Sequence, residues 1–515
     1  METTPASTRR LVQSPPVLNE GPLQLRMASS LLLWKTIIQV TIFFLSSCVK
    51  MSEDTKSPEE VLKEYLEPCK DVEPPPKVTL EEFVEKSDAF SVPFPVQTAR
   101  VKTLIKNGID KETLEDKINS SYPLIHERLL PLIAMFIHKK QQFGRKKEKE
   151  LYSSMTLVEF VNRLLKRRPI VFFNPSDVYL LQDGTEGSEG FENIGHSHES
   201  PKLSITEYMS YDEIKISALV CVSSKSFFIN DGSRHNRGVP GPAGSFQQEG
   251  VIVGMVGARF ERAGVMEYQD CAITPEQNTN DRGYGNDPPE KRWLVKEWGK
   301  LWNNSTLPTW EEAEGDDFLT VVSRVKLNTK VYKARIQMSA QLLLIEASSR
   351  AAAAGLKAYV HVVGLGLGVW QVCHQQNDLF VEAWGDALAS VDTTHIGYVD
   401  FSWIKATSCH GATEGEKFPN TEVILHFSQR ALHAPVPEGT LLVDSYAWDG
   451  NSLPGNEYWK GMLSASGDPA AACSSQIAEL HNSLISPLVT AENLHIASSH
   501  GVEHIAQYAK RFLER

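Results

Sequence analysis

The spacing of apolar residues divides the chain into a part with helical periodicity and a longer part in which strands alternate with helices. Between residues 52 and 168 apolar side chains recur every three or four positions, which predicts helices, one of them buried from Tyr122 to His138. From Ile170 onward short apolar runs typical of strands appear. We expect three parts: an extension over 1–51, a helical accessory region over 52–168, and an α/β domain over 169–515.

The apolar runs of the third part predict the layout of a sheet. Strands that alternate with helices favour a mixed, mainly parallel sheet with helices on both faces, a three-layer α/β/α core. A long helix is expected over 333–354, with Gly355 ending it. The strands are predicted at 170–173, 214–222, 358–363, 396–401, 422–427 and 440–446. Ligands bind such sheets outside the carboxyl ends of the strands, so the loops that follow the strands are candidate sites.

The segment from Ser226 to Phe260 contains an unusual loop. A short apolar run ends at Phe228 and Ile229, and a glycine-rich loop then leads to an isolated acid, Glu249. Glycines let a ligand approach the main chain closely, so a loop with free N–H groups suits phosphate oxygens. The glycines of this first loop are Gly232, Gly238, Gly241, Gly244 and Gly250.

A second glycine-rich loop, from Gly364 to Trp370, follows the strand predicted at 358–363 and precedes a helix expected over 378–388. Loop N–H groups and a helix amino terminus that point at the same anion form a phosphate-binding arrangement. A G-x-G-x-G motif alone is a weak signal, because glycines also mark close packing. Together the two loops predict the two halves of a nucleotide-diphosphate cleft.

A third segment, Tyr446 to Trp459, concentrates acids, amides and aromatic rings directly after a strand. Loops this rich in polar side chains commonly carry sites, so Asp449 and Asn456 are candidate ligand-binding residues. Asp468 precedes Pro469 and suits a helix cap. A second interpretation makes Asp468 an acid that acts together with Asp449 and Glu457.

Two further features have both a structural and a functional interpretation. The basic run from Lys139 to Lys149 suits a solvated helix face, with phosphate or acidic phospholipid as the alternative partner. A group of tryptophans suits either the packing of a helix onto the core or a platform for adenine or a peptide. These tryptophans are Trp293, Trp298, Trp302 and Trp310.

Composition narrows the classes of function. The net charge of −12 argues against non-specific binding of nucleic acid. Seven cysteines without a C-x-x-C pair indicate neither a zinc site nor a disulfide framework. His196 and His198 lie in a polar loop without a third ligand, so we expect no metal and no other cofactor. The absence of G-x-S-x-G and Walker motifs disfavours a serine hydrolase and a simple NTPase.

The extension contains one marginal apolar segment. Residues 29–47 are apolar but include Lys35 and Gln39, whereas a bilayer span needs about 20 apolar residues. The segment is compatible with a membrane anchor or a signal-peptide core. Otherwise we expect a cytoplasmic protein, whose contact with a membrane would occur only through these residues.

The first loop and its flanks resemble the macrodomain superfamily, in particular its poly(ADP-ribose) glycohydrolase branch. Gly238-Val239 and the run from Ala243 to Glu249 fall on that branch's G-V-x(n)-A-G-x-x-Q-E-E pattern, with Gln248 in place of the first glutamate. The segment from Gly364 to Trp370 is similar to the branch's N-W-G-C-G-A-F diphosphate loop, without the asparagine and tryptophan ahead of its glycines. The resemblance implies a macrodomain-like core that binds ADP-ribose, free or attached to protein.

The resemblance also implies roles for individual residues. Glu249 is the expected catalytic acid, which protonates the leaving oxygen of a glycosidic bond. The implied ligand-binding residues are Asn230, Asp231, Gly238, Val239, Gly244, Gln247, Gln248, Gly364, Gly366, Gly368 and Trp370. We therefore expect an ADP-ribose-directed hydrolase that removes or trims ADP-ribose from protein or polymer. Two alternatives stay open: a module that binds ADP-ribose or a related nucleotide without cleaving it, and a hydrolase or transferase that acts on another nucleotide or sugar.

Overall fold

A nine-stranded sheet forms the centre of the computed structural model, which describes residues 56–173 and 175–515. Five neighbouring strands, β14-β11-β10-β15-β6, run parallel. β5 is antiparallel to both β6 and β1, β1 is parallel to β16, and β17 closes the edge antiparallel to β16. In sheet order the strands are β14 (Ile424–His426), β11 (Ile396–Phe401), β10 (Lys357–Val362), β15 (Thr440–Ala447), β6 (Glu249–Met255), β5 (Cys221–Phe227), β1 (Tyr122–His126), β16 (His495–Ser498) and β17 (Gly501–His504). The expected mixed, mainly parallel sheet is confirmed.

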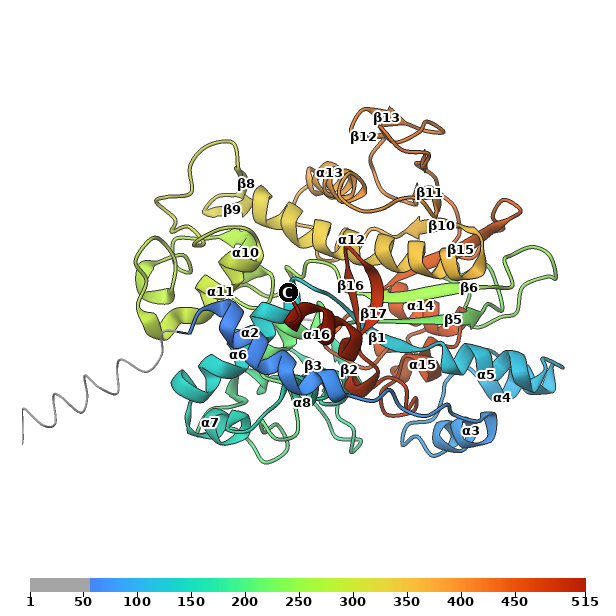
Figure 1. The fold of residues 1–515 in the computed structure, drawn as a ribbon, viewed down its shortest axis with the longest axis horizontal. Helices are drawn as coiled ribbons and strands as arrows, with labels where there is room; N and C mark the ends of the chain where they lie inside the picture. The colour runs from blue at the N-terminus through green and yellow to red at the C-terminus, as the bar shows by residue number, and fades with distance from the viewer. Residues whose placement is uncertain (1–55, 174) are drawn as a thin grey trace, which may run out of the picture. The chain divides into compact units, whose positions relative to one another are not determined.

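Helices cover both faces of this sheet. The longest, α12 (Thr329–Ala354), lies along one face and contacts β10, β15, β16 and β17 (Figure 1). Ser223 and Ser224 are neighbours in β5, so their side chains point to opposite faces. The Ser223 hydroxyl donates to Glu346 of α12, whereas the Ser224 hydroxyl bonds to His481, which follows α14 (Gly467–Ser474) and α15 (Ile477–Leu480). The α14–α15 segment therefore covers the face opposite α12.

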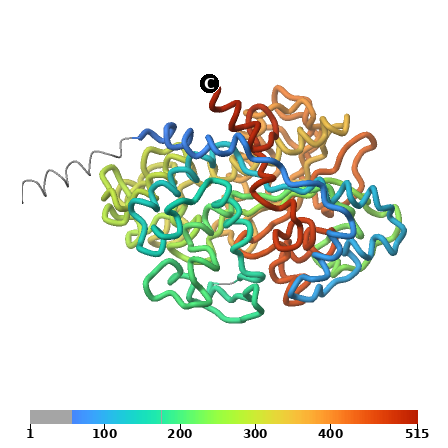
Figure 2. Tube along the Cα trace, turned by 60° about the horizontal axis from the view of Figure 1, so that its bottom comes forward, coloured from blue at the N-terminus to red at the C-terminus, as the bar shows by residue number. Residues whose placement is uncertain are grey.

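The other helices lie around the edges and ends of the sheet. The amino-terminal α2 lies beside the carboxyl-terminal α16 (Figure 2). The remaining helices of the described residues are α2 (Pro58–Leu66), α3 (Leu80–Asp88), α4 (Val101–Lys106), α5 (Lys111–Asn119), α6 (Leu129–Phe143), α7 (Lys146–Tyr152), α8 (Leu157–Lys166), α9 (Tyr211–Ser217), α10 (Tyr268–Cys271), α11 (Trp293–Leu301), α13 (Gln376–Leu388), α14 (Gly467–Ser474), α15 (Ile477–Leu480) and α16 (Ile505–Leu513). None of the described helices is long and apolar enough to cross a membrane, and residues 29–47 lie outside the described part.

Three small sheets complete the described fold. The first joins β2 (Val171–Phe173), β3 (Val178–Leu180) and β4 (Glu186–Gly187). The second joins β7 (Ala272–Ile273), β9 (Val325–Asn328) and β8 (Phe318–Val322), and the third is a hairpin of β12 (Ser408–Cys409) and β13 (Ala412–Thr413). Of these, β2 contributes to the candidate site, because its main chain bonds to a loop that follows β15.

Two secondary-structure elements that were predicted from the sequence are wrong. The helix expected from Tyr122 to His138 is instead β1 followed by α6, because the buried run Pro-Leu-Ile-His has no alternation that distinguishes a strand from a helix. The strand expected at 214–222 is split between α9 and β5, since Ser210 and Glu213 form a capping box that begins a helix. Other elements are confirmed, including β11 at its predicted bounds and α12, which ends at Gly355 with a φ of 67°.

The position of β1 bears on the expected division of the chain. β1 belongs to the region expected to be an accessory domain, yet it pairs with β5 and β16 inside the central sheet. Residues Pro58–Arg515 form one compact unit. A boundary at 168/169 stays a prediction, and the sheet takes residues from both sides of it.

Candidate active site

The loops that follow β6, β10, β11 and β15 leave the same edge of the sheet, because these strands are parallel. The loops after β6 and β10 touch through their main chains. A Cβ at Gly257 would lie 2.3 Å from the amide nitrogen of Gly366, and a Cβ at Gly366 would lie 2.9 Å from the carbonyl oxygen of Ala258. Gly366 also has a φ of 78°, so both contact and conformation require glycine there. We call this edge the carboxyl edge.

The second glycine loop presents unused main-chain donors at the carboxyl edge. Within the part of the chain that the structure describes, the amides of Gly364, Gly366 and Gly368 donate no hydrogen bond. The space beside Gly368 is open, since an added Cβ would meet no atom within 4 Å, and the neighbouring Val369 is 88% exposed. Free N–H groups at an exposed turn suit the oxygens of an anion, as the sequence predicts.

Three acids lie in the loops that follow β15. Asp449 lies two residues after the end of β15 and accepts a hydrogen bond from the Asn456 side-chain amide. Glu457 is partly buried and accepts a bond of 3.2 Å from the Ser466 hydroxyl. Asp468 is fully buried, and its Oδ1 accepts a 2.7 Å bond from the Gly455 amide while its Oδ2 has no partner among the described residues. Asp468 is therefore not the helix cap that its position before Pro469 suggests.

These acids hold protons more tightly than ordinary carboxyl groups. Burial, followed by the charge of Glu457, raises the pKa of Asp449 well above its usual range. Burial and the charges of Asp449 and Glu457 do the same to the pKa of Asp468. Burial also raises the pKa of Glu457. Neighbouring carboxyl groups that cannot all ionise together are typical of sites for acid and base catalysis.

Glu261 joins the acids to the second glycine loop. The indole N–H of Trp370, at the end of that loop, donates to the Glu261 carboxylate over 3.4 Å. Burial raises the pKa of Glu261, and its charge adds to the raised pKa of Asp449 and of Glu457. The structure therefore brings three predicted positions together: Asp449, Trp370 and the second glycine loop. Glu261 itself was not predicted, although a charged residue shortly after a buried strand was an available signal.

Asn456 supports this site from inside. It is fully buried, its Oδ1 accepts a 2.9 Å bond from the Phe172 amide of β2, and its Nδ2 donates to Asp449 and to the Phe172 carbonyl. The same amide thus ties β2 to the loop after β15. The ligand contact expected of Asn456 stays a prediction; in the structure its buried side-chain amide orients the Asp449 carboxylate.

Glu249 does not lie at the carboxyl edge. It begins β6, and the seven residues of β6 span about 20 Å at ~3.3 Å per residue. Its side chain is 54% exposed and pairs with Lys117 over 2.6 Å. The cleft expected between the two glycine loops has no support from this placement and stays a prediction, because β5 and β6 are antiparallel and the first loop therefore starts and ends at the amino end of β6. The catalytic role expected of Glu249 stays a prediction that this position does not favour.

The first glycine loop uses its own polar groups internally. Asn230 is buried, accepts a 3.0 Å bond from the Gly232 amide and donates to the Val239 carbonyl. The Gly238 amide donates to Asn236, and the Ser233 amide donates to Asp231. The main-chain amide of Gln247 donates to the His433 carbonyl. The side chains of Val239 and Gln248 and the main chain of Gly244 are exposed. Ligand contacts at these residues stay predictions, but the glycine amides that bond within the loop are not free for phosphate.

One residue of the first loop does reach the acids. The Arg234 guanidinium donates to the carbonyls of Ser464 and Ala465, just before α14. Burial raises the pKa of Glu457, and the positive charge of Arg234 lowers the same pKa. The sequence offered no reason to expect this contact from Arg234 and not from Arg237, which lies three residues later in the same loop.

A buried group of aspartate, histidine and serine lies under the same strands. His433 Nδ1 is 2.8 Å from Asp444 of β15, and His433 Nε2 is 3.1 Å from the Ser474 hydroxyl at the end of α14. All three side chains are completely buried, and Phe228 stacks on the His433 ring at 3.6 Å. No substrate can reach the serine, so this group anchors α14 and the first loop to β15.

Comparisons with known proteins give a consistent result. The model of the family described as "ADP-ribosylhydrolase MavL-like" matches residues 81–511. The chain is 40% identical over 465 residues to ADP-ribosylarginine hydrolase CG3568 of Drosophila melanogaster, covering 85% of this chain and 90% of the relative. It is 38% identical over 477 residues to ADP-ribosylarginine hydrolase CG2909 of the same organism, covering 88% of this chain and 94% of the relative.

Proposed function

Since the chain belongs to the MavL-like ADP-ribosylhydrolase family, we propose that it removes ADP-ribose from arginine side chains of proteins at the carboxyl edge of its sheet. Family membership confirms the ADP-ribose-directed hydrolase expected from the sequence. The names of the two Drosophila relatives support arginine as the linked residue. The observation that carries the proposal is the group Asp449, Glu457 and Asp468, next to a loop with free amides.

We also propose that the core of the protein is macrodomain-like. Five parallel strands with glycine and acid loops at their carboxyl ends support it. The poly(ADP-ribose) glycohydrolase branch has less support, because the residue expected to be its acid, Glu249, lies at the other end of β6.

The second glycine loop is suited to hold the diphosphate. The amides of Gly364, Gly366 and Gly368 donate to no group of the described protein, so they can donate to phosphate oxygens. Glycine at the open position Gly368 leaves room for a ligand close to the main chain. The ribose attached to arginine would then extend toward the acids, to which Glu261 and Trp370 connect the loop.

The reaction replaces a C–N bond by a C–O bond. The bond between the anomeric carbon of the ribose and the guanidine nitrogen breaks, and water supplies the new hydroxyl group. One proton of that water stays on the hydroxyl, and the other passes through a carboxyl group to the leaving guanidine. Positive charge develops on the sugar in the transition state, and a nearby carboxylate stabilises it.

Asp449 and Glu457 are the acids that can contact the substrate, because both are partly exposed, whereas Asp468 is fully buried. We assign them the transfer of protons between water and guanidine. Asp468 lies close to both acids: burial and the charges of Asp449 and Glu457 raise its pKa, and its Oδ1 holds the Gly455 amide. A raised pKa keeps a carboxyl group protonated nearer neutral pH, where it can donate to the leaving nitrogen.

The test measures release of ADP-ribose from a peptide that carries ADP-ribosylated arginine. Asp449→Asn and Glu457→Gln should each lower kcat/KM by about 100-fold or more, since each removes a proton-transfer group. The matched control is Glu249→Gln, which changes an exposed acid at the other end of β6 and should keep kcat/KM within about twofold. Thermal unfolding of each variant verifies that it folds. If Asp449→Asn cleaves the peptide as fast as wild type and Glu249→Gln does not cleave it, the assignment of proton transfer to Asp449 is wrong.

A further inference from the structure

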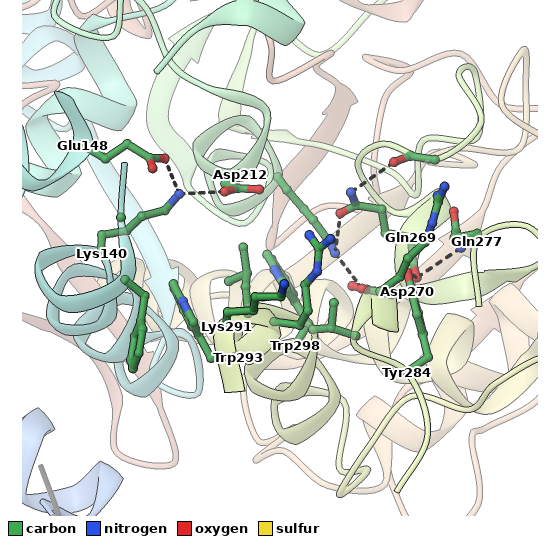
Figure 3. Close-up of a pocket in the computed structure, with 18 of the residues that line it drawn as sticks. Lys140, Glu148, Asp212, Gln269, Asp270, Gln277, Tyr284, Lys291, Trp293 and Trp298 are labelled. Carbon is green, nitrogen blue, oxygen red and sulfur yellow. Dashed lines mark hydrogen bonds and ion pairs between the residues drawn. The ribbon is translucent and has the colours of Figure 1, made fainter. Parts of the chain in front are cut away.

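A separate pocket of about 530 Å³ lies among α6, α9, α10 and α11. Figure 3 shows Lys291, Trp293 and Trp298 between one group of side chains around Lys140 and another around Asp270. Neither the three acids nor any residue of the second glycine loop lines it. The volume is in the range of pockets that hold small organic ligands, which are about 300–1,000 Å³.

The pocket wall has an excess of positive charge, although the chain has a net charge of −12. Three of its cations have acidic partners: Lys140 pairs with Glu148 and Asp212, Arg145 pairs with Glu148 over 3.5 Å, and Lys215 pairs with Asp270 over 2.6 Å. Arg282, Lys291 and Arg292 also line the pocket, and none of them has an acidic partner among residues 56–173 and 175–515. These exposed cations leave charge available for an anion such as a phosphate group.

Two buried polar atoms of the pocket lining lack partners. Trp298 is 2% exposed, and its indole N–H has no acceptor among the described residues. Gln277 is 8% exposed, and its Oε1 has no donor there, while its Nε2 bonds to the Ala272 carbonyl at 2.9 Å. Buried polar groups are usually satisfied, so unpartnered ones in a pocket lining indicate a ligand.

The two atoms place different demands on a ligand. The Trp298 N–H needs an acceptor, which a phosphate oxygen or a ring nitrogen supplies. Gln277 Oε1 needs a donor, which the ionised oxygens of a phosphate group cannot supply but a ribose hydroxyl or an exocyclic amine can. The ligand therefore combines an anionic part with hydroxyl or amine donors.

An aromatic wall narrows the ligand further. Trp293 lines the pocket, is half-buried, and has Phe136 packed edge-on at 6.1 Å. A partly exposed indole beside cations is suited to stack on a flat base. The sequence left open whether the tryptophans pack α11 or form a platform. Trp298 and Trp302 are buried and stack on each other at 5.8 Å, which is packing, whereas Trp293 retains exposed surface in the pocket.

We propose that this pocket binds a nucleoside phosphate at a second site, distinct from the carboxyl edge. The phosphates lie against Arg282, Lys291 and Arg292, the base stacks on Trp293, and Trp298 and Gln277 bond to polar groups of the ligand. Gly264 lines the pocket and is three residues from Glu261, so at most about 11 Å of chain connects this site to Glu261 at the carboxyl edge. The proposal does not depend on the reaction at the carboxyl edge.

The experiment is a calorimetric titration of the full chain with ADP, ribose 5-phosphate and inorganic pyrophosphate. The test variant is the double substitution Lys291→Glu with Arg292→Glu. The matched control is Lys86→Glu with Lys106→Glu, which makes the same charge change at exposed lysines of α3 and α4. We expect one ADP site to weaken by at least about tenfold in the test variant alone, because charge-assisted bonds are lost. Release of ADP-ribose from the arginine peptide should stay within about twofold in both variants.

A second variant keeps the proposal testable at the level of a single atom. Trp298→Phe retains a ring in the core but removes the indole N–H, and it should weaken ADP binding by about three- to tenfold. The proposal is overturned if wild type does not bind ADP, or if the charge variant and its control bind ADP equally well. It is also overturned if pyrophosphate or ribose 5-phosphate binds as tightly as ADP, because the base then contributes nothing.

Discussion

Two glycine-rich loops of similar composition differ in what their main-chain donors do. In the first loop the amides of Gly232 and Gly238 bond to asparagine side chains, and the Gly241 amide bonds to the Ile229 carbonyl. In the second loop Gly364, Gly366 and Gly368 donate to no acceptor within the described chain. Asparagine and aspartate readily bond to nearby main-chain amides, so they turn a glycine loop into a self-contained structure. A glycine loop without such residues is the better candidate for an anion site.

The loops also differ in their surroundings. The first is anchored underneath by His433, which stacks on Phe228 and whose amide donates to the Asp231 carbonyl. The second touches the loop after β6 through Gly257 and Gly366, and Trp370 links it to the acids. The first loop is thus held by its own polar groups and extends Arg234 toward the acids, whereas the second loop leaves three glycine amides without an acceptor in the described chain.

The largest expected effect is that of Gly366→Ala. A Cβ would lie 2.9 Å from the Ala258 carbonyl oxygen at a φ of 78°, so we expect a loss of about 2–4 kcal/mol in the free energy of unfolding. Cleavage of the arginine peptide should fall by about 100-fold, because the loop amides move. The measurements are denaturant unfolding and ADP-ribose release.

The matched control for this substitution lies in the first loop. Gly244→Ala has the same φ of 78°, but nothing lies within 4 Å of its Cβ. It should cost about 1 kcal/mol from backbone strain alone and leave cleavage unchanged. Equal loss of activity in the two variants would remove the distinction between the loops.

Gly368→Ala separates binding from folding. The added Cβ has no neighbour within 4 Å and φ is not positive, so the free energy of unfolding should change by no more than about 0.5 kcal/mol. The methyl group occupies the space assigned to the diphosphate, and ADP-ribose should bind about tenfold more weakly by calorimetry. Unchanged affinity here, with weaker binding in Gly244→Ala, would move the phosphate site to the first loop.

Arg234→Gln tests the one link from the first loop to the acids. The positive charge lowers the pKa of Glu457, so its removal should raise that pKa and shift the acid limb of the kcat/KM profile to higher pH. Arg237→Gln is the control, since the charge of Arg237 acts on Cys473. A shift of equal size in both variants would mean that Arg234 has no particular effect on Glu457.

The smallest effect concerns the anchor of the first loop. Burial raises the pKa of Asp444 to about 7 and lowers that of His433 to about 3, so both groups are uncharged between these two pH values. Because the pKa of Asp444 is higher in the folded than in the unfolded protein, its protonated form stabilises the fold. This contribution to the free energy of unfolding is fully present below the pKa of the unfolded state and is lost as the pH rises through about 7. Wild type should therefore lose about 1 kcal/mol between pH 6 and pH 8 through this group.

Asp444→Asn should abolish that part of the pH dependence while keeping an acceptor or donor beside His433. Urea unfolding of both proteins at pH 6 and pH 8 measures the difference. Cleavage of the arginine peptide should change little, because the pair is buried below the site. If wild type and Asp444→Asn lose the same free energy of unfolding between pH 6 and pH 8, the pH dependence comes from groups other than Asp444.

Much of the fold and part of the site follow from the sequence alone. The apolar runs predicted β10, β11 and β15, the period and terminal glycine predicted α12, and their alternation predicted a mainly parallel sheet. The second glycine loop and Asp449 were found because each directly follows such a strand. The resemblance carried by the loop motifs was enough to predict an ADP-ribose-directed hydrolase.

Only the tertiary structure decided which predicted residues share an edge of the sheet. Glu249 begins β6 and Gly366 follows β10, and the parallel direction of β6, β15 and β10 puts these two residues at opposite edges of the sheet. Local patterns record where a strand begins and ends, not its direction relative to strands that are far away in the sequence. Glu261 and Arg234 reach the acids for the same reason, through contacts between segments separated by more than 100 residues.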